Sequence, residues 1–315
     1  MKKILSVVVA LVATMSVSAQ RIVVVTGSNT KTCQTLKDAI DGSSNGSVIY
    51  LPGGGFQIHD SVKITKRVTI MGIGHKALSE NADGNTVISG NLWFNAGSSG
   101  SAVMGCYISG DVNIGDGDAS IHNVFVKYCN LNSVQVKNNT CTGTIVNQSY
   151  IRGHSNLKNA SAEFTNNIIG SIELLSGGIF SNNIVLGNSG YWPMASISNC
   201  TISSNVITSG LYNNGQSTSG VITNNMYAGG YGNDCVNVNG VDWNTIFVKN
   251  AGVTPASDFH FTDDYKQYSD IGIYGGTGFS DGALPPVPYV VEKSIPEQTD
   301  AAGKLNIKIR VRASE

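Results

Sequence analysis

The chain has 315 residues and a net charge of −1, and only 13% of its residues are charged. A chain of this length can bury a large core without disulfides or metals. The chain lacks the excess of positive charge that binding to nucleic acid or to an anionic lipid surface requires.

The first residues have the pattern of an export signal. Lys2 and Lys3 precede an apolar run over residues 4–12, and small residues lead to an expected cut after Ala19. This run is too short to span a bilayer, and no later apolar segment is long enough. We therefore predict a signal peptide over residues 1–19 and a mature chain without a transmembrane segment. The mature chain is expected in the periplasm, on the cell surface or in the medium.

The region after the signal indicates a strand, a helix and a second strand. Residues 22–25 are a β-branched run, and residues 48–51 read as a buried strand. Between them, Thr32 can cap a short helix over residues 32–41. A stack of short coils needs a cover over its first coil, and this helix is suited to that role.

A short cassette recurs through residues 106–226, with a small polar residue, any residue, and then an aliphatic anchor. The anchors are 16 to 24 residues apart, at Ile108, Leu131, Ile151, Ile168, Ile184, Ile202 and Met226. A unit this short cannot bury an apolar face alone, so its copies must stack. The cassette therefore predicts a β-solenoid whose asparagines form amide ladders at the turns. Alternation in residues 134–136, 162–164 and 172–174 predicts strands with one buried face.

Two segments near the start are similar to a known family. Residues 35–40, TLKDAI, and residues 46–58, GSVIYLPGGGFQI, resemble the N-terminal cap of the pectate-lyase-like superfamily. Residues 68–72 and 86–90 continue that pattern, and the repeat character extends to about residue 250. The resemblance implies an all-β fold, a right-handed parallel β-helix with a helical N-terminal cap and three short sheets. Many different activities share this scaffold.

The composition changes after about residue 255. Residues 258–261 and 270–276 resemble the terminal coil of exported bacterial β-helix proteins. We predict a β-helix domain over residues 20–284, then a Pro-rich spacer and a β-hairpin-like tail over residues 285–315. Two roles remain open for this tail: it could cap the stack, or it could serve export, docking or oligomerisation.

The six cysteines are interpreted as buried thiols rather than bridges. Three of them, Cys106, Cys129 and Cys200, occupy the polar position of the cassette. Side chains stacked on adjacent coils point in parallel, which does not suit a disulfide. The other three cysteines have no evident partners, and no pair has zinc-ligand spacing.

Catalytic residues are scarce on the predicted coils. The glycoside hydrolases of the similar family need paired carboxylates, but residues 119–233 contain only Glu163 and Glu173, both expected to point outward. A polysaccharide lyase needs a cation for the uronate carboxylate and a base for the α-proton. Arg152 and His154 are the candidates for these two roles. An ordinary solvated turn accounts for the same two residues.

Two further groups could bind a ligand. Asp111, Asn113, Asp116 and Asp118 place oxygen ligands at close spacing and could hold Ca²⁺, although Asp-Gly pairs also occur in ordinary turns. No cofactor is required otherwise. An aromatic platform is predicted from Tyr191, Trp192, Tyr212, Asn213 and Asn214, because sugar CH faces stack on rings while amides take the hydroxyls. Alternatively, Trp192 could fold back over the edge of the core.

The sequence thus favours an exported, non-catalytic β-helix protein that binds a polysaccharide or surface glycan, or that has a structural role at the cell surface. The alternative is a divergent polysaccharide lyase acting on an acidic polysaccharide.

Overall fold

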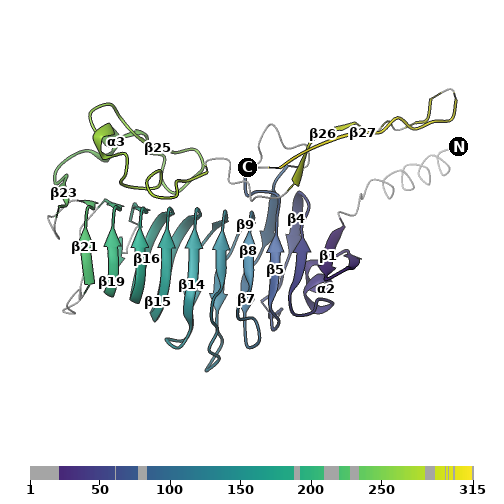
Figure 1. The fold of residues 1–315 in the computed structure, drawn as a ribbon, viewed down its shortest axis with the longest axis horizontal. Helices are drawn as coiled ribbons and strands as arrows, with labels where there is room; N and C mark the ends of the chain where they lie inside the picture. Colours follow the sequence, from purple (N-terminus) through teal and green to yellow (C-terminus); the bar gives the residue numbers. More distant parts are fainter. Residues whose placement is uncertain are drawn as a thin grey trace, which may run out of the picture.

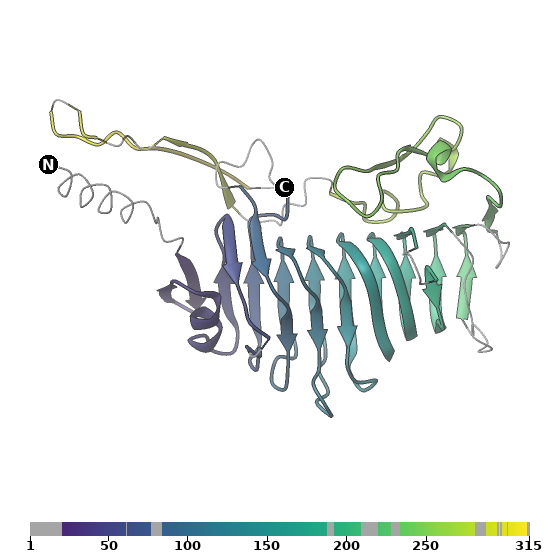
Figure 2. The same ribbon diagram turned by 180° about the vertical axis from the view of Figure 1, so that it is seen from behind.

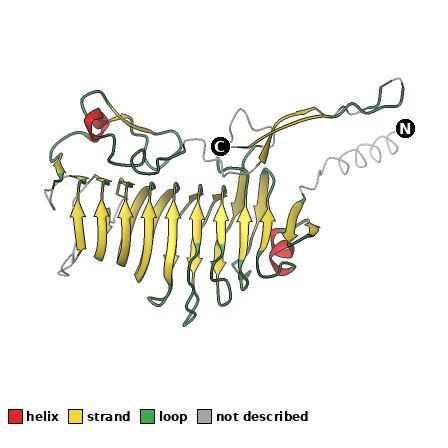
Figure 3. Cartoon of the chain, viewed as in Figure 1, coloured by secondary structure: helices red, strands yellow, loops and turns green. Residues whose placement is uncertain are grey.

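The computed structural model describes residues 21–60, 62–76, 84–187, 192–208, 220–227, 234–280, 288–294, 296, 298–300 and 302–313. The predicted fold class is confirmed: the chain is nearly all-β and forms a parallel β-solenoid of about eight turns (Figures 1 and 3). No helix in these ranges is long and apolar enough to cross a membrane. The signal-peptide prediction concerns residues outside them.

The coils stack into three parallel sheets, here called A, B and C. The long strands β15 (Tyr150–Thr165) and β16 (Ile168–Ser181) turn two corners each and contribute to all three sheets. Besides them, sheet A contains β3 (Ser47–Tyr50), β5 (Val68–Met71), β8 (Ala102–Met104), β11 (Phe125–Lys127), β14 (Thr142–Asn147), β19 (Ser198–Ser203) and β21 (Gly220–Thr223).

The other two sheets are built in the same way. Sheet B contains β4 (Gly54–Gln57), β6 (Thr86–Ser89), β9 (Tyr107–Ile108), β12 (Asn130–Leu131), β17 (Ile184–Val185), β20 (Val206–Ile207), β22 (Met226–Tyr227) and β23 (Val236–Asn237). Sheet C contains β7 (Leu92–Phe94), β10 (Val112–Ile114), β13 (Val134–Val136) and β18 (Met194–Ala195).

Alternating residues place one face of each strand in the interior of the stack. Val134 and Val136 are buried on either side of a half-exposed Gln135, as predicted, and residues 162–164 follow the same pattern. The prediction for residues 172–174 was wrong at its last position. Leu174 has a positive φ of 56° and is half-buried, and Leu175 takes the inward place instead.

The N-terminal region contains a hairpin as well as the expected helix. β1 (Ile22–Thr26) pairs antiparallel with β2 (Asn29–Cys33) and with β3, the first strand of sheet A. The helix α2 (Leu36–Asp41) begins after Thr35, whose hydroxyl accepts a bond from the Asp38 amide. Thr32 lies in β2, so the prediction that it caps the helix was wrong. Helix α2 lies at the N-terminal end of the stack (Figure 1), and its role as a cover stays a prediction.

A ladder of buried asparagines joins the later coils between sheets A and B. The Nδ2 group of Asn167 donates to Oδ1 of Asn183 over 3.0 Å, Asn183 donates likewise to Asn205, and Asn205 to Asn225. Each Oδ1 also accepts the backbone N–H of the preceding ladder residue. The predicted amide ladder is confirmed, and it leaves these buried amides hydrogen-bonded.

The register of the cassette differs from the prediction by one residue in three coils. Ile151 pairs with Ile169 rather than Ile168, and Ile169 pairs with Val185 rather than Ile184. In the same series, Tyr227 and not Met226 continues the inward row. The predicted Ile202 belongs to sheet A, where Cys200 pairs with Gly178, so this copy was placed in the wrong sheet.

The outside of sheet B is covered by a segment that we call the C-terminal overlay, residues 238–279. It contains α3 (Trp243–Ile246), β24 (Phe247–Lys249), β25 (Asp258–Phe261) and the 3-10 helix η1 (Lys266–Tyr268). Its apolar side chains form one buried cluster with the outward residues of sheet B, Tyr150, Ile168, Ile184, Val206 and Met226. Figure 2 shows the overlay running along the stack. Because β24 and β25 pair antiparallel in a separate sheet, the prediction of a terminal coil here was wrong.

The tail forms the predicted hairpin, of β26 (Pro288–Ser294) and β27 (Lys308–Ala313). The apolar side chains of residues 305–311 are open to solvent, with exposed fractions from 44% at Leu305 to 57% at Val311. In Figure 1 the hairpin projects from the stack on the side of the N-terminal coils.

The six cysteines are free thiols, and five of them are buried. Burial raises the pKa of Cys129 to about 12 and that of Cys200 to about 11. Cys106 and Cys129 donate to the carbonyls of Met104 and Lys127, two residues before each of them.

Candidate functional site

The outer face of sheet C carries one polar or aromatic side chain on each of six consecutive coils. The β-bridge between Ile64 and Phe94 places Lys63 level with Trp93. The strand pairings along sheet C align the other members in the same way. The members of this row, which we call the sheet C row, are Lys63, Trp93, Asn113, Gln135, Asn156 and Glu173. Because adjacent strands are ~4.8 Å apart, the row repeats at about the length of one sugar ring.

Two lysines approach the indole ring of Trp93. The Lys63 Nζ atom lies 3.5 Å from the ring centroid, and the Lys137 Nζ atom lies 5.5 Å from it. Burial lowers the pKa of Lys137, and the nearby Asp111 carboxylate opposes that shift. The Trp93 Nε1 group is buried and has no hydrogen-bond partner. This end of the sheet C row therefore combines two cations, an aromatic face and an unused donor.

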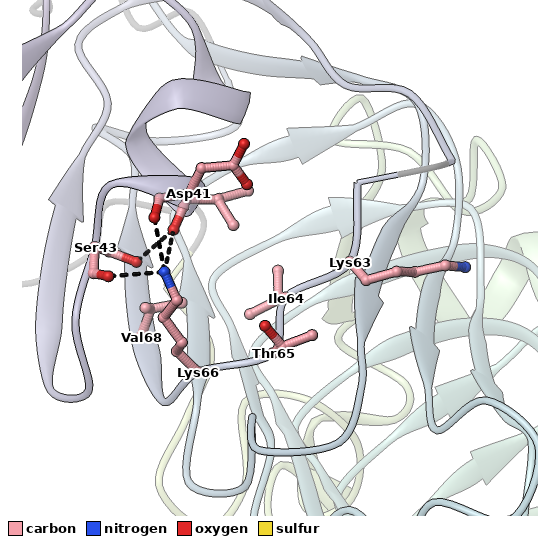
Figure 4. Close-up of a pocket in the computed structure, with 8 residues that line it drawn as sticks. Asp41, Ser43, Lys63, Ile64, Thr65, Lys66 and Val68 are labelled. Carbon is pink, nitrogen blue, oxygen red and sulfur yellow. Dashed lines mark hydrogen bonds between the residues drawn. The ribbon is translucent and has the colours of Figure 1, made fainter.

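Figure 4 shows how Lys63 differs from its neighbour Lys66. The Lys66 ammonium group donates to the carbonyls of Asp41 at 2.7 Å and Ser43 at 2.9 Å, just after helix α2, so it stabilises the end of that helix. Lys63 extends in a different direction, away from this cluster. Lys66, which lines a cavity of about 280 Å³, therefore has a structural role.

The four residues predicted to hold calcium are spread along one strand. Asp111 precedes β10 and accepts bonds from Asn132 at 2.7 Å and Ser133 at 2.6 Å. Asp116 follows β10 and lies 3.7 Å from the Lys63 ammonium group. Asn113 lies between them and is only 3% exposed, yet no hydrogen bond joins its side chain to the described part of the chain. Within that part, Asp111, Asp116 and Asp118 form no group of three metal-ligating side chains.

His154 is held by two neighbours on the next coil. Its Nδ1 atom lies 2.9 Å from the Ser171 hydroxyl, and its Nε2 atom lies 3.2 Å from a carboxylate oxygen of Glu173. Glu173 also accepts a 2.5 Å bond from the Asn156 amide. Both glutamates on the middle coils are half-buried: Glu163 lies between two buried residues, and Glu173 follows the buried Ile172. His154 thus has the carboxylate partner that the sequence did not reveal.

Arg152 reaches in the opposite direction along the stack. Its guanidinium group donates to the carbonyls of Ile108 at 2.9 Å and Ser109 at 3.2 Å and lies 4.6 Å from the Tyr107 ring centroid. These partners lie two coils before Arg152, whereas the partners of His154 lie on the coil after it. The structure therefore does not direct the side chains of the two predicted lyase residues towards a common site.

The predicted aromatic platform is only partly described. Trp192 is 53% exposed, so it does not fold over the core edge. The next residue, Pro193, accepts the backbone N–H of Ile172, which places Trp192 beside the last coils of sheet C. Tyr191, Tyr212, Asn213 and Asn214 lie outside the described residues.

Sequence reasoning missed Lys63, Trp93 and Lys137. The signal was present, because Trp93 stands between Leu92 and Phe94 in the same apolar-x-apolar pattern that marks Gln135. The proximity of Lys63 to Trp93 depends on a coil of about 30 residues that carries no cassette.

Comparisons of the chain with protein-family models, with curated proteins and with solved structures found no match.

Proposed function

We propose that this chain is an exported, non-catalytic β-helix protein that binds an acidic polysaccharide along the outer face of sheet C. The observation that carries the proposal is the convergence of Lys63 and Lys137 on the half-buried Trp93 ring. Export is supported by the pattern of residues 1–19. The N-terminal sequence pattern supports a relationship to the pectate-lyase-like superfamily.

The chemistry at Trp93 favours an anionic sugar. A uronate carboxylate can take the place of Asp116 beside the Lys63 ammonium group, because that ion pair is long and partly exposed. The sugar ring can pack against the indole, and Lys137 supplies a second positive charge.

The length of the face suits an extended chain. Five strand spacings separate Trp93 from Ala195, the residue that follows Glu173 in register. That distance is about 24 Å, enough for several sugar residues. Gln135 and Asn156 lie along the way, with their amide nitrogens bonded to protein groups. Trp192 lies beside the far end.

The geometry favours binding over lyase chemistry. Arg152 is bonded to backbone carbonyls, so its guanidinium group is not directed at a carboxylate above the sheet. Both ring nitrogens of His154 contact protein groups, which leaves neither aimed at an α-proton. A lyase built on these residues would need both side chains to move.

The test uses the mature chain, residues 20–315, with and without Ca²⁺. Retardation in affinity gels that contain polygalacturonate, alginate or a neutral glucan is measured, together with the ultraviolet absorbance of unsaturated uronates. We expect retardation by an acidic polysaccharide and no new absorbance. New absorbance that is lost in Arg152→Ala or His154→Ala would establish the lyase alternative. If no gel retards the chain, a structural role at the cell surface is the hypothesis that remains.

A further inference from the structure

A second groove lies on the outer face of sheet A, on a different side of the stack from the sheet C row. Its volume is about 440 Å³. The floor is formed by outward residues of β11, β14, β15 and β16, and one wall is formed by Gly276 and Thr277 of the C-terminal overlay. The overlay, which runs along the stack in Figure 2, therefore contributes one side of the groove.

The wall is fixed by asparagines at that corner. Asn166 and Asn182 both have positive φ values, 52° and 54°, so their side chains point away from the buried ladder. The Asn166 amide donates to the Gly275 carbonyl at 2.7 Å, and the Asn182 amide donates to the Asp270 carbonyl at 2.9 Å. The Thr277 hydroxyl donates to the side-chain Oδ1 atom of Asn166 at 2.9 Å. These bonds hold the wall and leave the side chains of Lys127, Glu163 and Ser181 on the floor unused.

The floor carries a row of polar groups, one on each coil. The row begins with the charged Lys127, and the neutral Asn147, Thr165 and Ser181 stand in register with it on neighbouring strands. Ile145 also lines the groove, so apolar surface is available beside the hydroxyl and amide groups. This combination matches a sugar, which presents CH faces and hydroxyls together.

One cation and one anion line the same groove without being paired. Lys127 and Glu163 are both half-buried, and neither makes an ion pair within the described residues. Their charges cancel, so the floor has no net attraction for an anionic polymer. A carboxylate and an ammonium group are also the strongest acceptor and donor that a hydroxyl can meet.

From this geometry we propose that the sheet A groove is a second saccharide site, one that binds a short uncharged oligosaccharide. Glu163 accepts hydrogen bonds from its hydroxyls, Lys127 donates to them, and Asn147, Thr165 and Ser181 contact the rings along the row. The site does not depend on the acidic polysaccharide proposed for sheet C. With both sites, one chain could bridge an acidic and a neutral glycan.

The experiment is calorimetric titration of the mature chain with neutral oligosaccharides of glucose, xylose, mannose and N-acetylglucosamine. We expect weak binding of at least one of them, reduced about tenfold or more in Glu163→Gln and in Lys127→Met, since each change removes a hydrogen bond to a charged group. Lys249→Met and Asp263→Asn, on the exposed overlay, are the matched controls and should bind normally. Thermal unfolding of every variant verifies that it is folded.

Two outcomes would overturn the proposal: no binding of any neutral oligosaccharide, or binding that both groove variants leave unchanged. Trp93→Ala separates this site from sheet C, because it should leave neutral binding intact. If Trp93→Ala abolishes neutral binding, the ligand occupies sheet C and the sheet A site is wrong. Loss of acidic-polysaccharide binding alone would refute only the proposal for sheet C.

Discussion

The ammonium group of Lys63 lies 3.5 Å from the centre of the Trp93 ring, although 30 residues separate them in the chain. The contact arises because the first coil places Lys63 directly over the strand that carries Trp93. It unites a cation and an aromatic face at one end of the sheet C row. A cation–π contact of this kind is worth about 0.5–1 kcal/mol at an exposed site, so a ligand can replace it at little cost.

The asparagine ladder is expected to be a main contributor to stability. Asn183 donates to the Phe164 carbonyl and to Asn205, and it accepts from both amide groups of Asn167. In Asn183→Ala these buried partners lose their bonds, so the free energy of unfolding should fall by about 3 kcal/mol. Denaturant unfolding measures the change, with the exposed Asn239→Ala as control. Equal stability of the two variants would contradict this role for the ladder.

The same ladder explains what the sequence could and could not predict. The cassette indicated the solenoid, but Asn166-Asn167 and Asn182-Asn183 each offer two asparagines for one inward position. Alternation normally resolves such a choice, since one face of a strand is polar. Here the overlay buries the outside as well, so Ile168 and Ile169 are both buried and the pattern has no polar face. The one-residue error in register follows from this two-sided burial.

Gly178 should tolerate no side chain. Its φ is +116°, and a Cβ atom built there would lie 2.0 Å from the Ala162 carbonyl oxygen on the neighbouring coil. We expect Gly178→Ala to lower the free energy of unfolding by about 3 kcal/mol, from backbone strain and displacement of that coil. Gly55→Ala is the matched control, because no atom lies within 4 Å of the corresponding position. A Gly178→Ala protein as stable as the control would show that the coils are looser than the structure indicates.

His75 should make stability depend on pH. The residue is buried against Tyr150, and burial lowers its pKa from 6.5 to about 3, with a smaller effect from the charge of Lys76. Above pH 6.5 the ring is neutral in both states. As the pH falls from 6.5 towards 3, His75 is protonated in the unfolded chain but stays neutral in the folded one. The free energy of unfolding therefore falls by up to about 5 kcal/mol.

The measurement for His75 is the free energy of unfolding at several pH values for the natural chain and for His75→Phe. The natural chain should lose stability relative to His75→Phe as the pH falls, because phenylalanine cannot be protonated. A difference that stays constant from pH 7 to pH 4 would show that His75 is protonated in the folded state.

The candidate site was harder to predict than the fold. Stacking follows from local alternation, which a single sequence displays. The approach of Lys63 and Lys137 to Trp93 depends on which coils become neighbours and on how the turns direct long side chains. The aromatic signal drew attention to Trp192, which is indeed exposed. Trp93 was overlooked although it stands between Leu92 and Phe94 in the pattern that marks an outward position, because its coil carries no cassette.

The cysteines provide a direct test of the buried interior. Cys235 alone is half-buried, and burial raises the pKa of Cys106, Cys129, Cys141 and Cys200. A protonated, buried thiol is unreactive. In a thiol-reagent assay without reductant, we expect about one rapidly reacting group in the native chain and all six after denaturation. A total below six in denaturant would indicate disulfides and contradict the structure.

The most direct test of the central claim is the affinity of Trp93→Ala and of the double variant Lys63→Ala/Lys137→Ala for an acidic oligosaccharide, measured by calorimetry at fixed ionic strength. Lys249→Ala is the control for a lost surface charge. We expect both sheet C variants to bind at least about tenfold more weakly than the natural chain, while the control is unchanged. Undiminished binding by folded Trp93→Ala would show that the outer face of sheet C is not the glycan site.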